Sequence, residues 1–208
     1  MKFTFGIPTV LENRERMIKI IESIKAQNIP EYEIIIVGGE NIYQGISNIR
    51  FVQFDESIKS KWITRKKNII AEIASYDNIV LFHDYYEFID GWYSGYIGFG
   101  EDWDICQNIC LDIDGNRYYD WVAWDHPYYP KYSIVQNNED SKNLYVPGHY
   151  FLAKKKVLLE TPLNEALIWG ESEDIDWTNR IRDKNYRYRM NSSSVVKHLK
   201  KYRGYIEK

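Results

Sequence analysis

Strand-like apolar runs alternate with helical repeats over residues 1–88, and this alternation constrains the fold more than any other feature. Residues 3–7 are rich in apolar side chains, and residues 34–37 form a continuous apolar run of the kind found in strands buried on both faces. Between them, apolar residues recur at helical spacing behind Asn13, which can cap a helix. The pattern predicts βαβ units around a mainly parallel sheet flanked by helices, an α/β fold.

The alternation continues for two further units and then stops. We expect a weaker strand over residues 49–54, a helix over 61–75 and a buried strand over 79–82. Residues 85–132 then hold 15 of the 33 aromatic residues, mixed with acids and glycines. This composition predicts a folded, irregular, aromatic-rich insertion. It favours either a surface that receives a sugar or an aromatic core on the sheet edge, and the two interpretations are compatible.

The rest of the chain predicts shorter elements. We expect a short strand and then a short helix in the segment PGHYFLAKKKVLLE, after Val146. Residues 186–190 and 195–198 have strand character. Neither an internal repeat nor a low-complexity linker appears, so we expect one domain over residues 1–208.

Composition excludes several classes of function. The net charge of −3 leaves no general basic surface, so nucleic acid is not a favoured partner. The start MKFTFGIPT lacks the long apolar stretch of a signal peptide, and no apolar run approaches the length of a membrane span. Cys106 and Cys110 could hold a metal at their i, i+4 spacing, but buried free thiols are the favoured interpretation. We therefore expect a cytoplasmic protein.

Two concentrations of charge indicate where the chemistry lies. The strand over 79–82 ends abruptly in His83 and Asp84, and in α/β sheets ligands bind outside the carboxyl ends of the strands. Further along, Gly170 marks a turn and Ser172 can cap a helix that has Glu173 and Asp174 in its first turn. The helix dipole favours ionised carboxylates there. The structural alternatives are a strand-end carboxylate bonded to nearby amides and two ordinary charges at a helix start.

Five segments, in order, resemble the inverting glycosyltransferases of the GT-A fold, family-2 type: FTFGIPT, TRKKNIIAEIASYDNIVLFHD, PGHYFLAKK, WGESEDIDW and VVKHL. The resemblance implies a nucleotide-binding half over residues 1–88 and an acceptor-side half over 89–208. The chain departs from the family at its Asp-x-Asp motif, which here is His83-Asp84-Tyr85. One carboxylate therefore stands where the family usually has two.

The resemblance also implies an activity. It is the transfer of a hexose from a nucleotide sugar, most simply a UDP-sugar, to a hydroxyl of a glycan or lipid-linked acceptor with inversion, as in polysaccharide biosynthesis. A lipid-linked acceptor leaves room for peripheral contact with a membrane. The implied cofactor is Mn²⁺ or Mg²⁺, which would neutralise charge on the departing diphosphate. The implied roles are these: catalytic, Asp174 and Glu173; nucleotide-binding, Thr9, Glu12, Glu40, Lys67, Asn68, His83 and Asp84; acceptor or sugar, Gly148, His149, Trp169 and Gly170; metal, Asp84 and His198.

Two alternatives stay open at the level of sequence. The single carboxylate at the strand end favours a carbohydrate- or nucleotide-binding module on the same fold that has lost turnover. A nucleotidyltransferase would share the nucleotide-binding half. It usually carries a glycine-rich basic phosphate loop near residue 10, and GIPTVLENRER lacks one.

Overall fold

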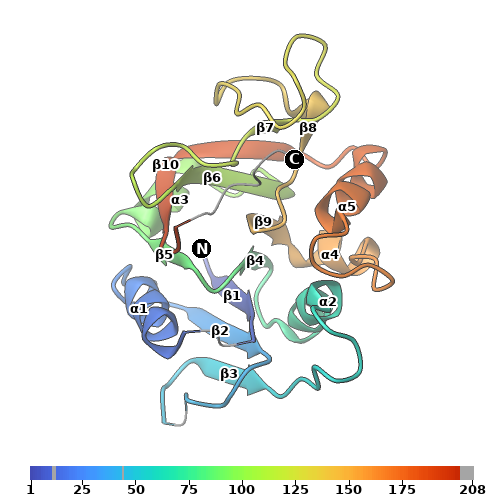
Figure 1. The fold of residues 1–208 in the computed structure, drawn as a ribbon. Coiled ribbons are helices and arrows are strands. Elements are labelled where there is room, and N and C mark those ends of the chain that lie inside the picture. The colour runs from blue at the N-terminus through green and yellow to red at the C-terminus, as the bar shows by residue number, and fades with distance from the viewer. Residues whose placement is uncertain (11–12, 44, 202–208) are drawn as a thin grey trace.

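The computed structural model describes residues 1–10, 13–43 and 45–201. Within them, one sheet of eight strands runs in the order β3-β2-β1-β4-β9-β6-β10-β5, and β7 and β8 form a separate two-stranded sheet (Figure 1). The elements are β1 (Phe3–Pro8), α1 (Arg14–Lys25), β2 (Tyr32–Val37), β3 (Ile49–Val52), α2 (Ile63–Ile73), β4 (Asn78–Phe82), β5 (Tyr86–Phe88), α3 (Trp92–Phe99), β6 (Ile105–Leu111), β7 (Val122–Ala123), the 3₁₀ helix η1 (Ser141–Asn143), β8 (Leu144–Tyr145), β9 (Tyr150–Lys154), α4 (Lys155–Glu160), α5 (Glu173–Arg182) and β10 (Tyr188–His198).

The first half of the chain folds as predicted. Strands β3, β2, β1 and β4 pair in parallel, with Phe5 opposite Ile34 on one side and Val80 on the other. The Asn13 side chain caps α1 by accepting a 2.8 Å hydrogen bond from the Arg16 amide. β3 ends at Val52, two residues earlier than predicted, and α2 lies inside the predicted 61–75 range.

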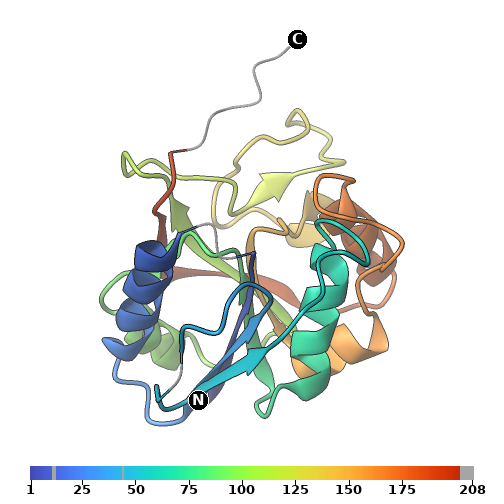
Figure 2. The same cartoon turned by 60° about the horizontal axis from the view of Figure 1, so that its bottom comes forward.

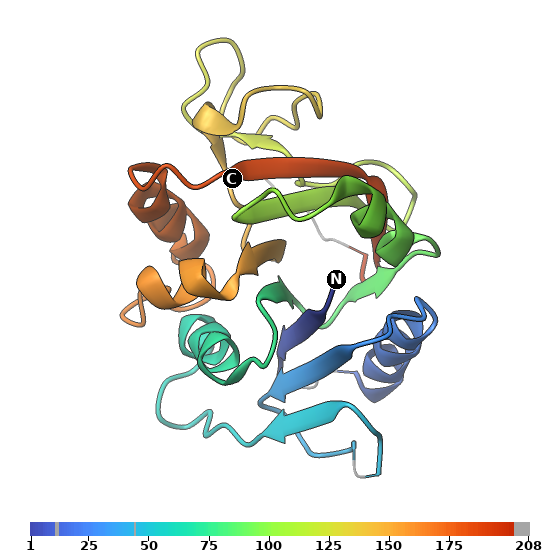
Figure 3. The same cartoon turned by 180° about the vertical axis from the view of Figure 1, so that it is seen from behind.

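Helices cover both faces of the sheet, because alternate side chains of each buried strand point to opposite faces. The face that includes Phe5 and Val80 packs against α1 and α3, whereas the face that includes Ile35 and Leu81 packs against α2, α4 and α5. Figure 2 shows α1 and α2 on opposite sides of β1 and β2, and Figure 3 shows α2, α4 and α5 grouped together. The carboxyl ends of the parallel strands therefore form an edge between two layers of helices.

The expectation of an irregular insertion over residues 85–132 is wrong for its first part. This stretch contains β5, α3 and β6, and β6 lies inside the sheet between β9 and β10. Several aromatic residues of this first part belong to the core: Trp92 and Tyr96 are fully buried. Their polar tips converge on one buried amide, since Asn108 Oδ1 accepts hydrogen bonds from Trp92 Nε1, Tyr96 Oη and Tyr150 Oη at 3.2, 3.1 and 2.6 Å. Polar atoms among the aromatic residues are thus satisfied inside the core.

Close packing explains Gly95, one of the two glycines in α3. A Cβ atom at Gly95 would lie 2.6 Å from the Ser193 carbonyl oxygen, so only glycine allows α3 to approach β10 this closely. β10 itself joins the two predicted stretches 186–190 and 195–198 into one strand, with a register shift between Asn191 and Val195.

Three smaller expectations can be compared with the structure. Cys106 and Cys110 are buried and free on β6, as favoured from the sequence. Ser172 occupies the N-cap position of α5, but its side chain makes no capping hydrogen bond, because its backbone is left-handed with φ 59°. Over the described ranges, no helix has both the length and the apolar character needed to cross a membrane.

Candidate functional site

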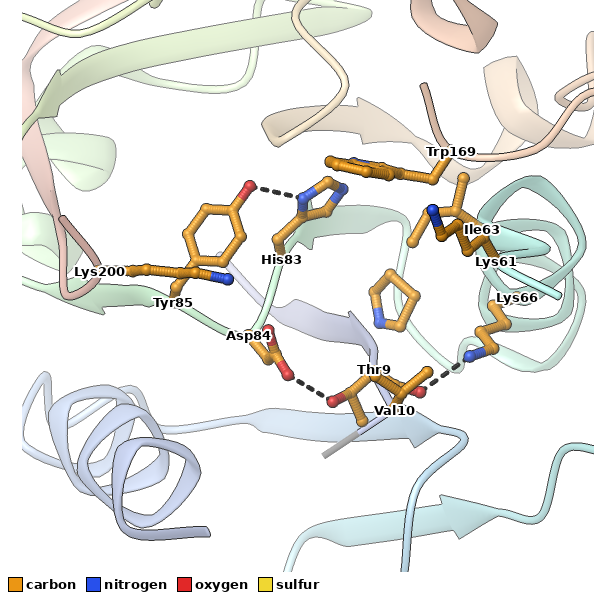
Figure 4. A pocket seen from close by; sticks show the side chains of 11 residues that line it. Thr9, Val10, Lys61, Ile63, Lys66, His83, Asp84, Tyr85, Trp169 and Lys200 are labelled. Atoms are coloured by element: carbon orange, nitrogen blue, oxygen red, sulfur yellow. Dashed lines mark hydrogen bonds between the residues drawn. The ribbon is translucent and has the colours of Figure 1, made fainter. Parts of the chain in front are cut away.

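A cavity of about 270 Å³ opens at the carboxyl ends of β1 and β4 (Figure 4). Because β1 and β4 are parallel neighbours, the residues that follow them meet at the same edge of the sheet. Four of the predicted site residues line this cavity together, although they lie up to 160 positions apart in the chain: Thr9, His83, Asp84 and Trp169. The remaining lining residues are Pro8, Val10, Lys61, Ile63, Lys66, Tyr85 and Lys200.

Asp84 is held in place by two neighbouring elements. Its Oδ2 accepts a 2.5 Å hydrogen bond from the Thr9 hydroxyl, which follows β1. Arg16 Nε on α1 donates to the Asp84 backbone carbonyl at 2.7 Å, and Arg16 Nη2 lies 3.6 Å from Oδ1. Both carboxylate oxygens therefore have fixed positions at the rim of the cavity.

His83 offers the cavity a nitrogen without a protein partner. The residue is 7 % exposed, and Nδ1 is bonded to the Tyr85 hydroxyl at 2.7 Å. Its Nε2 is buried and has no hydrogen-bond partner among the described residues. Burial, together with the nearby Lys67 ammonium, lowers the pKa of His83 well below its usual value, so the imidazole is neutral at neutral pH. An unpaired buried nitrogen facing a cavity is available to a ligand.

The cavity carries more positive than negative charge. Lys66 Nζ donates a 2.8 Å hydrogen bond to the Thr9 carbonyl and pairs with Glu56. Lys61 Nζ lies 5.5 Å from the centre of the Trp169 ring, whose residue is 47 % exposed. With Lys200, these lysines face a lining in which Asp84 is the one carboxylate among the described residues. Such a balance suits an anionic ligand.

The sequence interpretation missed Lys61 and Lys200 as lining residues. From the sequence, Lys66 could either approach the phosphates or lie on a solvated helix face, and Lys200 belongs to a basic tail. Their positions in the sequence could have indicated this role. Lys61 lies just before the start of helix α2, and Lys200 lies just after the end of strand β10.

A second cluster surrounds the predicted catalytic carboxylates. Lys67 Nζ donates a 2.6 Å hydrogen bond to the Gly148 carbonyl, and the Gly148 amide donates to Asp174 Oδ2 at 2.9 Å. Glu173 is 5 % exposed beside them, and burial raises its pKa while the Lys67 ammonium opposes this rise. The nearby carboxylate of Asp174 adds to the rise.

This second cluster adjoins the cavity at two points. The backbone amide of His83 donates to the His149 carbonyl at 2.9 Å, and His149 follows Gly148. On the other side, Trp169 lines the cavity and Gly170, with φ 88°, turns the chain towards Glu173. The two groups of predicted residues are therefore neighbours.

Two predicted residues, Asn68 and His149, make contacts away from the cavity. Asn68 Nδ2 donates hydrogen bonds to the Leu163 carbonyl and to Glu165 Oε1, and Asn68 Oδ1 accepts one from the Leu163 amide, all at 2.9 Å. The His149 ring is bonded to the Tyr86 hydroxyl at 2.9 Å and the Tyr119 carbonyl at 3.0 Å. Burial lowers the pKa of His149 to about 3.

The last three predicted residues are Glu40, His198 and Glu12. Glu40 is exposed and does not line the cavity. His198 packs its ring 4.4 Å from the Tyr85 ring and its Nδ1 contacts the Lys200 backbone, so it stands behind the cavity wall. Glu12 lies outside the described residues.

A larger cavity, of about 440 Å³, lies between α5, η1 and the start of β10. Arg182 and Tyr186 are among its lining residues, and Arg182 there pairs with Asp125 at 2.6 Å. None of the predicted site residues lines it. The chemistry predicted from the sequence thus gathers at the smaller cavity and its neighbouring carboxylates.

Comparison with known proteins identifies the fold. No family model and no curated protein matches the sequence. Among solved structures, S. aureus TarS matches with a TM-score of 0.71 and 14 % identity over 96 % of this chain and 37 % of that chain. A structure of TarS in complex with UDP-GlcNAc matches with a TM-score of 0.70 and 13 % identity, over 99 % of this chain and 62 % of that one.

GalNAc-T7 with UDP, GalNAc and Mn²⁺ matches with a TM-score of 0.73 and 12 % identity, over all of this chain and 44 % of that one. The chain therefore has the GT-A fold, as predicted, with a mostly parallel curled sheet like that of these glycosyltransferases. It spans less than two thirds of the length of the proteins it matches.

Proposed function

We propose that this chain is an inverting glycosyltransferase that binds a UDP-sugar in the cavity at the ends of β1 and β4. The main support for the proposal is that Thr9, His83 and Asp84 line this cavity together in a GT-A fold. Lys61, Lys66 and Lys200 are placed to neutralise a diphosphate. The similar structures hold UDP or UDP-GlcNAc, which supports this choice of donor.

Transfer needs a base for the acceptor, because a sugar hydroxyl is a poor nucleophile at neutral pH. Asp174 is the proposed base, since its carboxylate is fixed by the Gly148 amide beside the cavity. Glu173 would bind hydroxyls of the sugar or the acceptor, and Trp169 offers an exposed ring face for a sugar to stack on. The acceptor oxygen, deprotonated by Asp174, would attack the anomeric carbon from the face opposite the diphosphate. The bond to the nucleoside diphosphate breaks as the new bond forms, and the configuration inverts. The acceptor is a hydroxyl of a glycan or a lipid-linked sugar.

A divalent cation fits the donor set of this cavity in part. No group of three metal-binding side chains occurs within the described part of the chain. However, Mg²⁺ and Mn²⁺ are commonly bound by one or two carboxylates together with substrate phosphates. Asp84 and the unpartnered His83 Nε2 would hold it here, with His198 behind the cavity wall. When bound, the cation would neutralise charge on the diphosphate as the sugar bond breaks.

A thermal-shift screen of nucleotide sugars, with and without Mn²⁺, tests the proposal. A ligand that binds only the native state raises the melting temperature, so a UDP-sugar should stabilise the protein more than the free sugar does. Absence of stabilisation by every nucleotide and nucleotide sugar would refute the donor site.

The second candidate function is a nucleotide- or carbohydrate-binding module without turnover. It is favoured by Asp84 being the single carboxylate among the described residues that line the cavity. Donor hydrolysis separates the two functions. The transferase should release UDP slowly from its bound donor by using water as acceptor, whereas the binding module should bind the donor and release none.

A further inference from the structure

Lys67 is a fully buried lysine that does not line the cavity. Its side chain is 0 % exposed, and its Nζ donates to the Gly148 carbonyl at 2.6 Å. The ammonium also lies 5.7 Å from the centre of the Phe151 ring. Burial of a lysine is costly unless charged or polar partners compensate for the lost water. The role predicted from the sequence, contact with the nucleotide, gives no reason for a position closed off from the cavity.

The charges that face Lys67 are those of the proposed catalytic pair. Burial lowers its pKa, whereas the carboxylates of Glu173 and Asp174 oppose that change. The other titratable neighbours are neutral: His83 and His149 have lowered pKa values, and Tyr145, which faces Asp174 from β8, has a raised one. The buried Lys67 ammonium therefore interacts electrostatically with the two carboxylates of Glu173 and Asp174.

The backbone of Gly148 connects the lysine to Asp174. Its carbonyl accepts from Lys67 and its amide donates to Asp174 Oδ2. A Cβ atom at Gly148 would lie 2.9 Å from Asp174 Cβ, so the two segments are in direct contact. Any movement of Lys67 that shifts the residue 148 backbone would shift the carboxylate as well.

We infer that Lys67 is a positioning residue for the Glu173–Asp174 pair. Its ammonium fixes the Gly148 backbone that holds Asp174, and its charge opposes protonation of the buried Glu173. The catalytic part of this inference rests on the proposed function, but the electrostatic part does not. Since the ammonium opposes the raised pKa of Glu173, removing it should raise that pKa further.

Carboxyl ¹³C NMR titration of Glu173 tests the electrostatic part. In Lys67→Gln, which keeps a donor for the Gly148 carbonyl but not the charge, the midpoint should rise by about one pH unit. Lys25→Gln, at the exposed end of α1, is the matched control and should leave the midpoint unchanged. An unchanged midpoint in Lys67→Gln would overturn the inference. In the wild-type protein, the Lys67 ¹⁵Nζ signal should report an ammonium at pH 7, and a neutral amine would also overturn it.

The kinetic part uses the wild-type enzyme, Lys67→Gln and Lys67→Met. Both variants should have a lower kcat with little change in donor KM. In both, the pH at which kcat falls on the acid side of its profile should be higher than in the wild-type enzyme. A wild-type pH profile in both variants, or a change confined to donor KM, would refute the positioning role. If the wild-type protein transfers sugar to no acceptor, the proposed function fails, and the NMR titration still decides whether Lys67 controls Glu173.

Discussion

The Thr9 hydroxyl donates a 2.5 Å hydrogen bond to Asp84 Oδ2, and this bond joins the carboxyl ends of β1 and β4. It connects residues 75 positions apart at the point where the cavity opens. The contact fixes the carboxylate at the cavity, where we propose that the donor binds. It is the structural basis for assigning the donor to this cavity.

Replacing Asp84 by Asn should weaken UDP-sugar binding by about tenfold to a hundredfold, as expected for loss of a hydrogen-bonded charge. Stimulation of binding by Mn²⁺ should disappear in the same variant. Isothermal titration calorimetry measures both effects. Glu87→Gln is the control, because Glu87 is a nearby acid that pairs with Lys19 and does not line the cavity. Equal affinities for wild type and Asp84→Asn would contradict the assignment.

Replacing Asp174 by Asn should lower kcat by about 10²- to 10⁴-fold, the usual effect of removing a general base. Donor affinity should be unchanged, since Asp174 does not line the cavity. Asp176→Asn is the matched control, two positions along α5, where the native Asp176 pairs with Arg180. A loss of rate as large in the control would show that α5 as a whole, rather than the carboxylate of Asp174, is responsible.

Adding one methyl group at Gly148 should impair transfer without impairing donor binding. The Cβ of Gly148→Ala would meet Asp174 Cβ at 2.9 Å, so the carboxylate or the residue 148 backbone must shift. Gly98→Ala is a suitable comparison, because a Cβ there meets nothing within 4 Å. Initial rates and donor calorimetry on both variants test this expectation. Normal kcat in Gly148→Ala would show that the position of Asp174 is not critical.

Stability should fall as the pH is lowered from neutral, partly because of His149. Burial lowers its pKa from 6.5 to about 3, so the unfolded chain takes up a proton across this range and the folded chain does not. The free energy of unfolding therefore decreases as the pH falls through this range. Urea denaturation at pH 7.5 and pH 4.5 should show a smaller decrease in His149→Gln than in the wild-type protein. The same decrease in both would refute this source of pH sensitivity.

The sequence predicted the first four strands and the first two helices because their apolar periods are regular. It did not predict α3 or β6. α3 lacks a clear polar face, and β6 buries Gln107 and Asn108, which sequence patterns assign to the surface. Asn108 is tolerated because its Oδ1 accepts hydrogen bonds from aromatic partners on α3 and β9, and Gln107 Nε2 donates to the Tyr150 carbonyl at 2.7 Å. Such compensation depends on contacts distant in sequence.

The site was predictable where strand ends decide it, as for Thr9, His83 and Asp84. It was less predictable on α2, where adjacent residues project about 100° apart. Lys66 therefore lines the cavity whereas Lys67 is directed to Gly148, and Asn68 holds residues 163–165. Without the position of the sheet beneath the helix, the three polar side chains could not be told apart.

The most direct test of the donor site is a ¹H–¹⁵N NMR titration of the protein with a UDP-sugar. The largest shifts should occur at the amides of Thr9, His83 and Asp84 and at the indole of Trp169, with saturable binding. Shifts confined to the cavity near Arg182 and Tyr186, or no shifts at all, would contradict it.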